Sequence, residues 1–582
     1  MVRHDGWCAL TAEPDRWRLG SSLDAALDLE TRAWDRDNRV GRLWAKDASL
    51  WTSGDESRWL GWLDLLLDPP ETGALGELAS QLRGDGITDL LLLGMGGSSL
   101  APEVLSRVLP ASDGAPTLHV LDSTDPAQVG RIESGLDLSR TLCIVSSKSG
   151  TTLEPTILTE YFIDRFERVL GPDQVGSRFL AITDPDSALE TFARERQFRA
   201  VLPGVPSVGG RFSALSNFGL VPSALCGLDV ASLFDRARIM AARCGAEVQA
   251  GQNPGVRLGL ALGLAAAGGR DKVTLLLSPT IAPLGGWLEQ LLAESTGKHG
   301  RGVIPIVDES LGAPGDYGAD RLFVVMRLSG ESDPASGAID ELVVAGHSVV
   351  ELGLEDRHDV GAEFVRWEVA TAVCGAVLSV NPFDQPDVEA SKVATRELAE
   401  TYERAGAFPA EAPVAAQDGL TLYADADTAE ALKEGAGPAA GVGELLAAHV
   451  GRLREGDYLA LLAYLDMTPE HLAVLQRMRH AVRASHGVAT SVGFGPRFLH
   501  STGQAFKGGP DTGVFVQITA DDPNDLPIPG RGYTFGAVKT AQALGDFRVL
   551  VARHRRAVRV HLGHDVLGGL DRLEHLVCGT PR

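Results

Sequence analysis

The chain has 582 residues, of which 44% are apolar and 22% charged, a composition typical of globular proteins too long for a single core. Its 53 lysines and arginines against 77 aspartates and glutamates leave a net charge of −24, which opposes general binding to nucleic acids or anionic membranes. An anionic ligand would therefore have to bind at a local positive site.

Uncharged runs such as 258–269 and 273–288 are broken by glycine or proline and are too short to span a bilayer. The first residues contain no apolar signal core, so we expect a cytoplasmic protein. The six cysteines are scattered without a Cys-x-x-Cys pair, which favours buried thiols over disulfides or zinc ligands. We expect no metal.

Residues 1–70 mix tryptophans with helix-like charged patterns such as 23–36, which predicts a helical lead-in that packs its indoles against a larger body. The tryptophans are Trp7, Trp17, Trp34, Trp44, Trp51, Trp59 and Trp62. In residues 71–227, strand-like and helix-like stretches alternate, which predicts a doubly wound α/β domain. We expect its strands at 88–93, 117–121, 142–146 and 179–182.

Residues 228–403 repeat this alternation and predict a second α/β domain. A long helical stretch at 228–266 precedes expected strands at 273–277, 322–326 and 348–352 and a helix at 363–380. The segment 404–443 is rich in alanine, proline and glycine, so we interpret it as a linker. Residues 444–582 then predict a third, C-terminal α/β domain, with strands at 458–465, 489–492, 514–518 and 558–562.

Two turns rich in small polar residues follow strands of the first predicted domain. The strand-like 90–93 ends in Gly-Met-Gly-Gly-Ser-Ser, and the strand-like 142–146 ends in Ser-Lys-Ser-Gly-Thr-Thr, before the helix-like 153–166. At a strand-to-helix turn, free backbone N–H groups and the helix dipole favour an anion, and hydroxyls add donors. The candidate ligands are Gly97, Ser98, Ser147, Lys148, Ser149, Thr151 and Thr152.

Serine and threonine are also ordinary helix caps, so the turn at 147–152 alone fits a capped helix as well as a phosphate site. The turn at 94–99 favours the phosphate site. Turns at the carboxyl ends of neighbouring parallel strands meet in one crevice, where open α/β sheets bind ligands.

Two further stretches carry candidate catalytic residues. The helix-like 287–297 puts Gln290 and Glu294 one turn apart on one face, with Glu294 beside the negative end of the dipole. Such a glutamate is either a solvent-facing acid or a functional one. The proline-bracketed loop 381–386 leads into a helix in which Lys392 sits early, where a cation opposes the dipole and requires an anionic partner. Otherwise Lys392 is a surface lysine of that helix.

The motifs of residues 80–400, taken in their order along the chain, resemble those of the glucose-6-phosphate isomerase family. Asp387 stands where the family's second signature, here residues 383–392, usually has glycine. Because it follows a proline, this position need not require a positive φ. The resembling segments are 209–213 (first signature), 383–392 (second signature), 294–298 (catalytic base), and 96–98 with 147–152 (sugar-phosphate site).

The resemblance implies two sugar-isomerase (SIS-type) α-β-α sandwiches with mostly parallel sheets, a homodimer with shared active sites, and reversible isomerisation of glucose 6-phosphate to fructose 6-phosphate without a cofactor. Glu294 would move a proton between C2 and C1. Arg211 would stabilise the enediolate, and Lys392 would assist at the ring oxygen or the C1 hydroxyl. Gln290 and Gln385 would hold sugar hydroxyls.

The lead-in and the third domain look closer to the isomerase half of bifunctional transaldolase/glucose-6-phosphate isomerase fusions. We expect no transaldolase activity, because residues 1–70 are too few for such a barrel. A non-catalytic, sugar-phosphate-binding regulatory module stays open, since a fold does not determine a function, although the joint presence of Glu294, Arg211 and Lys392 argues against it. A dual phosphoglucose/phosphomannose isomerase also stays open, because nothing in the sequence reports on the configuration at C2.

The histidine that would open the sugar ring is missing from its usual place. In many bacterial members it lies in a Leu-His-Ser-x-Gly-Gln segment shortly after the catalytic glutamate, where this chain has no histidine at a suitable spacing. Residues 499–504, in the third domain, reproduce that segment. We predict that His500 reaches the site, within the chain or from a partner subunit, rather than being a structural histidine of a glycine-rich turn. The other candidate, His358, fits an ordinary helix start.

Overall fold

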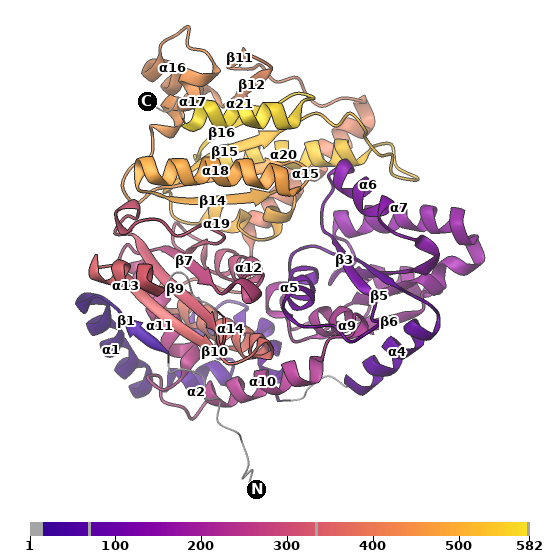
Figure 1. Ribbon diagram of the computed structural model, residues 1–582, viewed down its shortest axis with the longest axis horizontal. Coiled ribbons are helices and arrows are strands. Elements are labelled where there is room, and N and C mark those ends of the chain that lie inside the picture. Colours follow the sequence, from indigo (N-terminus) through magenta and orange to yellow (C-terminus); the bar gives the residue numbers. More distant parts are fainter. Residues whose placement is uncertain (1–14, 68–71, 332–335, 579–582) are drawn as a thin grey trace.

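The computed structural model describes residues 15–67, 72–331 and 336–578 (Figure 1). In this part of the chain, strands form two five-stranded sheets and one six-stranded sheet, and helices flank all three. The expected α/β class with mostly parallel sheets is confirmed. In the same described residues, no helix is both long enough and apolar enough to cross a membrane.

The first sheet is wholly parallel, with the strand order β3-β2-β4-β5-β6. β2 and β4 are almost continuous apolar runs, because helices cover both faces of a parallel sheet. The bounds are β2 (Asp89–Leu93), β3 (Thr117–Leu121), β4 (Thr141–Ser146), β5 (Phe179–Thr183) and β6 (Ala200–Pro203). The four strands predicted here are confirmed, whereas the short edge strand β6 was not predicted.

Several helices surround this sheet. α7 carries the hydroxyl-rich turn at its start, and α5 follows the glycine-rich turn. They are α4 (Thr72–Gly84), α5 (Leu100–Val108), α6 (Pro126–Ser134), α7 (Leu153–Leu170), α8 (Ala188–Glu195) and α9 (Asn217–Leu225).

The second sheet has the order β1-β10-β9-β7-β8, in which β1 is antiparallel to β10 and the other pairs are parallel. The lead-in is therefore not helical throughout, because β1 (Arg16–Arg18) adds an edge strand to this sheet. The remaining strands are β7 (Lys272–Leu277), β8 (Ile304–Ile306), β9 (Arg321–Leu328) and β10 (Ser348–Leu354).

The helical stretch predicted at 228–266 is two helices, because Asn253 caps the second one and Pro254 occupies its first turn. The helices of the lead-in and of the second sheet are α1 (Ser21–Arg36), α2 (Arg39–Trp44), α3 (Gly61–Leu65), α10 (Val230–Arg243), α11 (Pro254–Ala267), α12 (Leu284–Thr296), α13 (Ser336–Val344) and α14 (Val360–Leu378).

The expected packing of the lead-in indoles is confirmed for Trp34, Trp51 and Trp62, which are buried. The indole N–H of Trp51 also donates to the carbonyl of Ala372 on α14. Trp7 lies outside the described residues. The expected buried thiols are Cys143, Cys226, Cys244 and Cys374, whereas Cys578 is exposed and Cys8 is not described.

The third sheet has the order β11-β12-β16-β15-β13-β14. Here the linker predicted at 404–443 is corrected, because this segment holds a hairpin and a helix. The hairpin turns at Asp418 and Gly419, both at positive φ, and the side chains of Leu420 and Leu422 are buried. An Asp-Gly pair before alternating apolar residues is a hairpin signal, but the short strands and small residues masked it.

The elements of the third domain begin with α15, which follows the last helix of the second sheet. The strands are β11 (Ala415–Gln417), β12 (Leu420–Tyr423), β13 (Tyr458–Tyr464), β14 (Ala489–Phe494), β15 (Gly513–Thr519) and β16 (Arg556–His561). The helices are α15 (Pro386–Ala405), α16 (Ala426–Ala436), α17 (Val442–Val450), α18 (Pro469–His486), α19 (Gly503–Gly508), α20 (Phe535–Ala552) and α21 (Val566–Cys578), with the 3-10 turn η10 (Arg497–His500).

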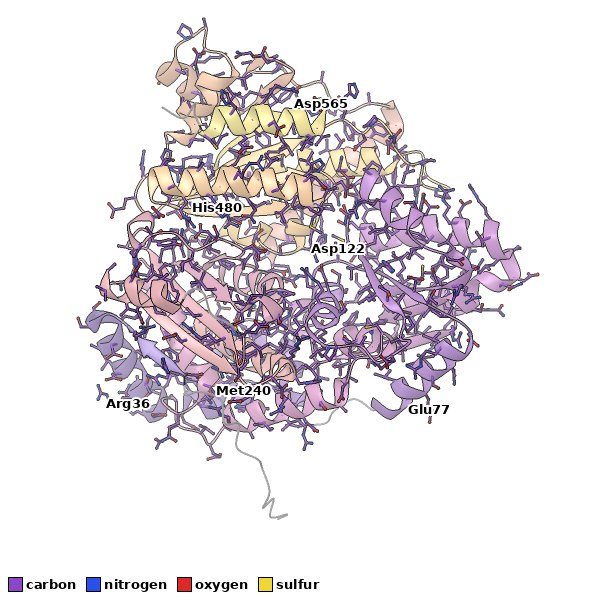
Figure 2. All side chains as sticks on the ribbon, viewed as in Figure 1. Arg36, Glu77, Asp122, Met240, His480 and Asp565 are labelled. Atoms are coloured by element: carbon purple, nitrogen blue, oxygen red, sulfur yellow. The ribbon has the colours of Figure 1, made fainter. Side chains whose placement is uncertain are left out.

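The third domain lies against both sandwiches (Figure 1). Ile528, Phe535 and Val538, from the loop before α20 and from α20 itself, join the hydrophobic core of the first sheet. Asp122, labelled in Figure 2, lies where the first and third domains meet and pairs with Arg497 at 3.0 Å. This junction brings the end of η10 to the sheet edge that carries the two polar turns.

Candidate active site

One cavity of about 1100 Å³ lies where the three domains meet. Its walls come from the two polar turns, from α12, from the start of α15 and from η10. All candidate residues line it: Gly97, Ser98, Ser147, Lys148, Ser149, Thr151, Thr152, Arg211, Gln290, Glu294, Gln385, Lys392 and His500. The runner-up His358 does not line it and instead lies beside Asp356, 3.3 Å from its carboxylate.

The turn between β4 and α7 leaves the side chain of its N-cap residue unused. Thr152, the N-cap residue of α7, makes no side-chain cap hydrogen bond, so its hydroxyl does not satisfy the N-terminal amides of the helix. The Oγ of Ser147 accepts from the amide of Gly150 at 3.2 Å, which holds the turn closed. Gly150 has a φ of 68°, and a Cβ there would lie 2.4 Å from the amide nitrogen of Leu189.

Lys148 is a candidate ligand of this turn, and its ammonium already has partners within the protein. Its Nζ donates to Oδ2 of Asp184 at 2.5 Å and to the carbonyls of Pro206 and Val205 at 3.0 and 3.2 Å. Asp184 follows β5, and Val205 and Pro206 follow β6, so the ammonium ties the turn to the ends of both strands. An anion in the turn would therefore be held mainly by neutral N–H and O–H donors.

The glycine-rich turn after β2 allows two backbones to meet. A Cβ on Gly97 would lie 1.9 Å from the carbonyl oxygen of Gly210, in the segment that carries Arg211. Gly96, at a φ of 54°, has the same role toward α12, because a Cβ there would lie 2.7 Å from Nε2 of Gln290. Glycine at these positions brings the turn, Arg211 and Gln290 into one wall of the cavity.

Glu294 is 7% exposed, and both of its carboxylate oxygens face donors. Its Oε1 lies 3.2 Å from Nη1 of Arg211, and its Oε2 accepts from Nε2 of Gln290 at 3.1 Å. The other donors of Arg211 bind Ser295, Gln385 and the carbonyls of Pro382 and Asp384. Burial lowers the pKa of the Arg211 guanidinium, and the charges of Glu294 and Asp384 oppose this shift.

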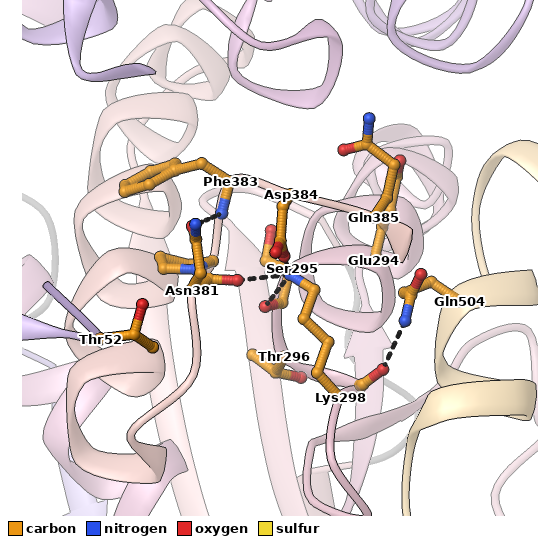
Figure 3. A network of polar contacts seen from close by, with 12 residues as sticks. Thr52, Glu294, Ser295, Thr296, Lys298, Asn381, Phe383, Asp384, Gln385 and Gln504 are labelled. Carbon is orange, nitrogen blue, oxygen red and sulfur yellow. Dashed lines mark hydrogen bonds and ion pairs between the residues drawn. The ribbon is translucent and has the colours of Figure 1, made fainter. Parts of the chain in front are cut away.

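Lys298 is a buried cation beneath this arrangement, and the sequence motif did not indicate a role for it. Its Nζ lies 3.0 Å from Oδ1 of Asp384 and donates to the carbonyls of Ser295 and Asn381 (Figure 3). Burial, followed by the nearby positive charge of Arg211, lowers its pKa to about 7. Lys298 therefore joins the end of α12 to the loop that carries Gln385.

His500, from η10 of the same chain, also lines the cavity, and its carbonyl accepts from Nε2 of Gln290 at 2.7 Å. Its Nε2 lies 3.0 Å from Oε1 of Glu154, which is buried at the start of α7. Burial favours the neutral acid, but the charge of His500 and its hydrogen bond outweigh this effect, so the pKa of Glu154 is lowered. Sequence reasoning missed Glu154; the only signal was an acid in the first turn of a helix beside the hydroxyl-rich turn.

Lys392 stands at the rim of the cavity on α15. Its side chain is 40% exposed, and its Nζ lies 2.7 Å from Oε1 of Glu389, one turn earlier. An exposed pair of this kind is weak, so Lys392 can turn from Glu389 to a bound anion.

Asp387, at the position where the family usually has glycine, is helical, and Gln504 of the His500 segment donates to its Oδ2 at 2.7 Å. A positive φ is not needed there.

No group of three or more His, Cys, Asp or Glu side chains is placed to hold a metal ion within the part of the chain described above.

Comparisons with known proteins indicate one family, that of the phosphoglucose isomerases. Residues 75–308 match the family model "Phosphoglucose isomerase". A curated glucose-6-phosphate isomerase of Rubrobacter xylanophilus is 33% identical over 54% of this chain and 83% of its own length, and one of Heliobacterium modesticaldum is 30% identical over 58% and 87%.

Two solved structures are similar to this chain in fold. A hypothetical protein of Thermus thermophilus is 26% identical, with a TM-score of 0.54 over 66% of this chain and 99% of that one. A glucose-6-phosphate isomerase of Chlamydia trachomatis, 18% identical with a TM-score of 0.50 over 66% and 86%, has the same fold. Since the Rubrobacter relative is matched over most of its length, the chain belongs to the phosphoglucose isomerase family.

Proposed function

We propose that this chain interconverts glucose 6-phosphate and fructose 6-phosphate by ring opening and proton transfer through an enediolate. The relatives named above carry this activity in their names. One observation carries the proposal: Nε2 of Gln290 donates both to Oε2 of Glu294 at 3.1 Å and to the carbonyl of His500 at 2.7 Å. The candidate base and the candidate ring-opening group therefore lie within reach of one side chain, beside an anion-binding turn.

Ring opening is the role that we assign to His500. Its Nε2 is engaged by Glu154, so Nδ1 is the ring nitrogen left to exchange a proton with the sugar ring. The carboxylate orients the imidazole and stabilises its protonated form. Lys392, at the rim, assists at the ring oxygen or the C1 hydroxyl by supplying a positive charge.

Isomerisation of the open sugar is assigned to Glu294 and Arg211. Glu294 takes the proton from C2 and returns it to C1, while the proton of the C2 hydroxyl passes to the C1 oxygen, so that the C1 aldehyde becomes a hydroxymethyl group and C2 becomes the ketone. Both of its oxygens accept from donors, as an ionised carboxylate does. Arg211, held in place by several acceptors, stabilises the negative charge that develops on the enediolate oxygens.

The phosphate is assigned to the turn between β4 and α7. Ser147, Ser149, Thr151 and Thr152 supply hydroxyls there, and the backbone amides at the start of an 18-residue helix supply N–H donors. Gly97 and Ser98 form the neighbouring wall of the cavity, and Gln290 and Gln385 face the sugar between the two ends. The mechanism assigned to these side chains requires no cofactor.

A coupled assay that follows fructose 6-phosphate formation from glucose 6-phosphate tests the proposal. We expect turnover without added metal or cofactor. A protein that binds the sugar phosphate but shows no turnover would support the regulatory module instead. Parallel assays with mannose 6-phosphate decide between a single and a dual specificity.

We also propose a cytoplasmic location and a homodimer, the latter on the basis of the family resemblance. Dimerisation is not needed to assemble the proposed machinery, because Glu294, Arg211, Lys392 and His500 line one cavity of one chain. Sedimentation equilibrium of the purified protein reports its oligomeric state.

A further inference from the structure

A buried glutamine of the third domain lies behind the pair of Glu154 and His500. Gln542, on α20, is 2% exposed, and its Nε2 lies 2.7 Å from Oε1 of Glu154. The same carboxylate oxygen lies 3.0 Å from Nε2 of His500. One oxygen of Glu154 therefore holds both side chains.

The Gln542 amide is oriented by its two neighbours, the carboxylate of Glu154 and the hydroxyl of Thr124. An ionised carboxylate only accepts hydrogen bonds, so the amide nitrogen of Gln542 must face Glu154 and the amide oxygen must face away. That oxygen lies 2.5 Å from Oγ1 of Thr124, which is fully buried in the segment after β3 and donates to it. The reversed amide would set oxygen against oxygen at Glu154.

We propose that Gln542, oriented by Thr124, is a positioning residue for ring opening; this inference rests on the proposed function. Its N–H donates to the carboxylate of Glu154 and holds it in place, and Glu154 in turn engages Nε2 of His500 and leaves Nδ1 for proton exchange with the sugar. Without this donor, Glu154 is free to rotate or to take up a proton, and His500 loses the partner that fixes its ring and its tautomer. The third domain therefore contributes both the histidine and its support.

The other charged and titratable groups near Gln542, Thr124, Glu154 and His500 have partners or roles of their own, so we assign the positioning role to Gln542. Lys392 of α15 is near enough to Glu154 to help lower its pKa. Tyr464 of β13 has its hydroxyl 3.4 Å from the backbone carbonyl of Gln542, and burial keeps the pKa of this phenol well above its usual range. The charged groups one turn away on α20 have partners of their own: Lys539 pairs with Asp125 and Asp522, and Asp546 pairs with Lys507.

Gln542→Leu removes the donor at similar volume and tests the proposal in the full-length protein. Gln542 lines the cavity but is assigned no contact with the sugar phosphate, so we expect kcat for glucose 6-phosphate to fall about tenfold while KM changes by less than about twofold. With substrate deuterated at C2, the isotope effect on kcat/KM should fall, because ring opening becomes slower than C–H cleavage. The acidic limb of the pH–rate profile should move to higher pH, because loss of the donor raises the proton affinity of the coupled pair of Glu154 and His500.

Thr124 provides a second, milder test with its own rescue. Thr124→Val keeps the shape but removes the hydroxyl, so it should reproduce part of the loss and of the shift in the pH limb. Thr124→Ser keeps the hydroxyl and should restore both. The matched control is Gln517→Leu, which removes another buried amide, one that donates to Ala543 and Asp546 away from the cavity. It should lower stability without moving the isotope effect or the pH limb.

The outcomes separate this inference from the function on which it rests. A wild-type protein without isomerase turnover overturns the proposed function. An active wild type, with Gln542→Leu at the wild-type kcat and an unmoved pH limb, overturns the positioning role. If Gln542→Leu does not fold, the Thr124 pair decides, and a Thr124→Ser protein as impaired as Thr124→Val also overturns it.

Discussion

At the scale of single residues, Glu294 is held by two donors, with Oε1 3.2 Å from Nη1 of Arg211 and Oε2 3.1 Å from Nε2 of Gln290. The motifs around Glu294, Arg211 and His500 indicated these side chains, and the structure brings them to one cavity. Glu154, Lys298 and Gln542 were not indicated, because their roles arise from contacts between residues far apart in the chain. A buried ion pair or amide of this kind leaves no periodic signal in the sequence.

Replacing Glu294 by glutamine tests the base. The amide has the same shape but cannot accept the C2 proton, so we expect kcat to fall by about 10² to 10⁴ while binding and folding are nearly unchanged. Glu289→Gln on the same helix is the matched control: burial, followed by repulsion from Asp308, raises the pKa of Glu289 to about 8, so it is already largely neutral near pH 7. Half of the wild-type kcat in Glu294→Gln would rule out the assignment.

The low pKa of Lys298 predicts a pH dependence of stability. Its folded pKa of about 7 lies below the usual lysine value of 10.5, so between these values the unfolded chain binds the proton and the folded chain does not. The contribution of Lys298 to the free energy of unfolding should therefore increase with pH in this window, by at most about 1.4 kcal/mol per pH unit. Lys298→Met removes this titration.

The measurement is the difference in thermal midpoint between wild type and Lys298→Met from about pH 6 to about pH 9, where the wild type should gain relative to the variant as pH rises. A difference that stays constant over this range contradicts the buried, titrating lysine.

At the scale of elements, the long buried strands were predictable and the short edge strands were not. β2, β4, β9 and β15 are apolar over most of their length because both faces are covered. β1, β8 and β11 have three residues each, too few for a pattern to stand out from its surroundings. The position of η10 beside the first domain could not be predicted either, because it depends on how the third domain docks.

The turn before α7 yields a prediction at this scale. Replacing Ser147 and Thr152 by alanine removes two hydroxyls from the start of a helix whose N-cap side chain is unused. KM for glucose 6-phosphate should rise more than kcat falls, because phosphate contacts act equally on the ground state and the transition state. Ser139→Ala, which removes an exposed hydroxyl bound to Asp137, is the control. If KM is unchanged in both Ser147→Ala and Thr152→Ala, the phosphate binds elsewhere.

The whole molecule is organised so that the third domain reaches back to the first. Arg131 pairs with Asp466, and Arg531 with Glu160, on either side of this contact. Together with the core residues shared near α20, these pairs hold η10 against the first domain within one chain. The α/β class of all three domains could be predicted, but their docking could not, because interdomain contacts leave no local pattern.

This docking makes a prediction about mixed oligomers. Subunits carrying Glu294→Gln, when refolded with subunits carrying His500→Ala, should show no activity beyond the sum of the two separate variants. Each cavity takes both residues from one chain, so every cavity in a mixed dimer keeps one defect. Recovery of activity on mixing, measured in the coupled assay at equal total protein, would mean that His500 is exchanged between subunits.

The short strand β1 has a consequence for the chain in solution. It covers part of β10, the last long strand of the second sheet, by pairing Arg16, Trp17 and Arg18 with residues 349–351. Arg18 also pairs with Glu351 at 2.6 Å, which places charge at this edge. An uncovered strand edge is a template for pairing with other chains. These three residues therefore protect the protein against aggregation, and a chain that lost them would expose a row of unpaired backbone groups to its neighbours.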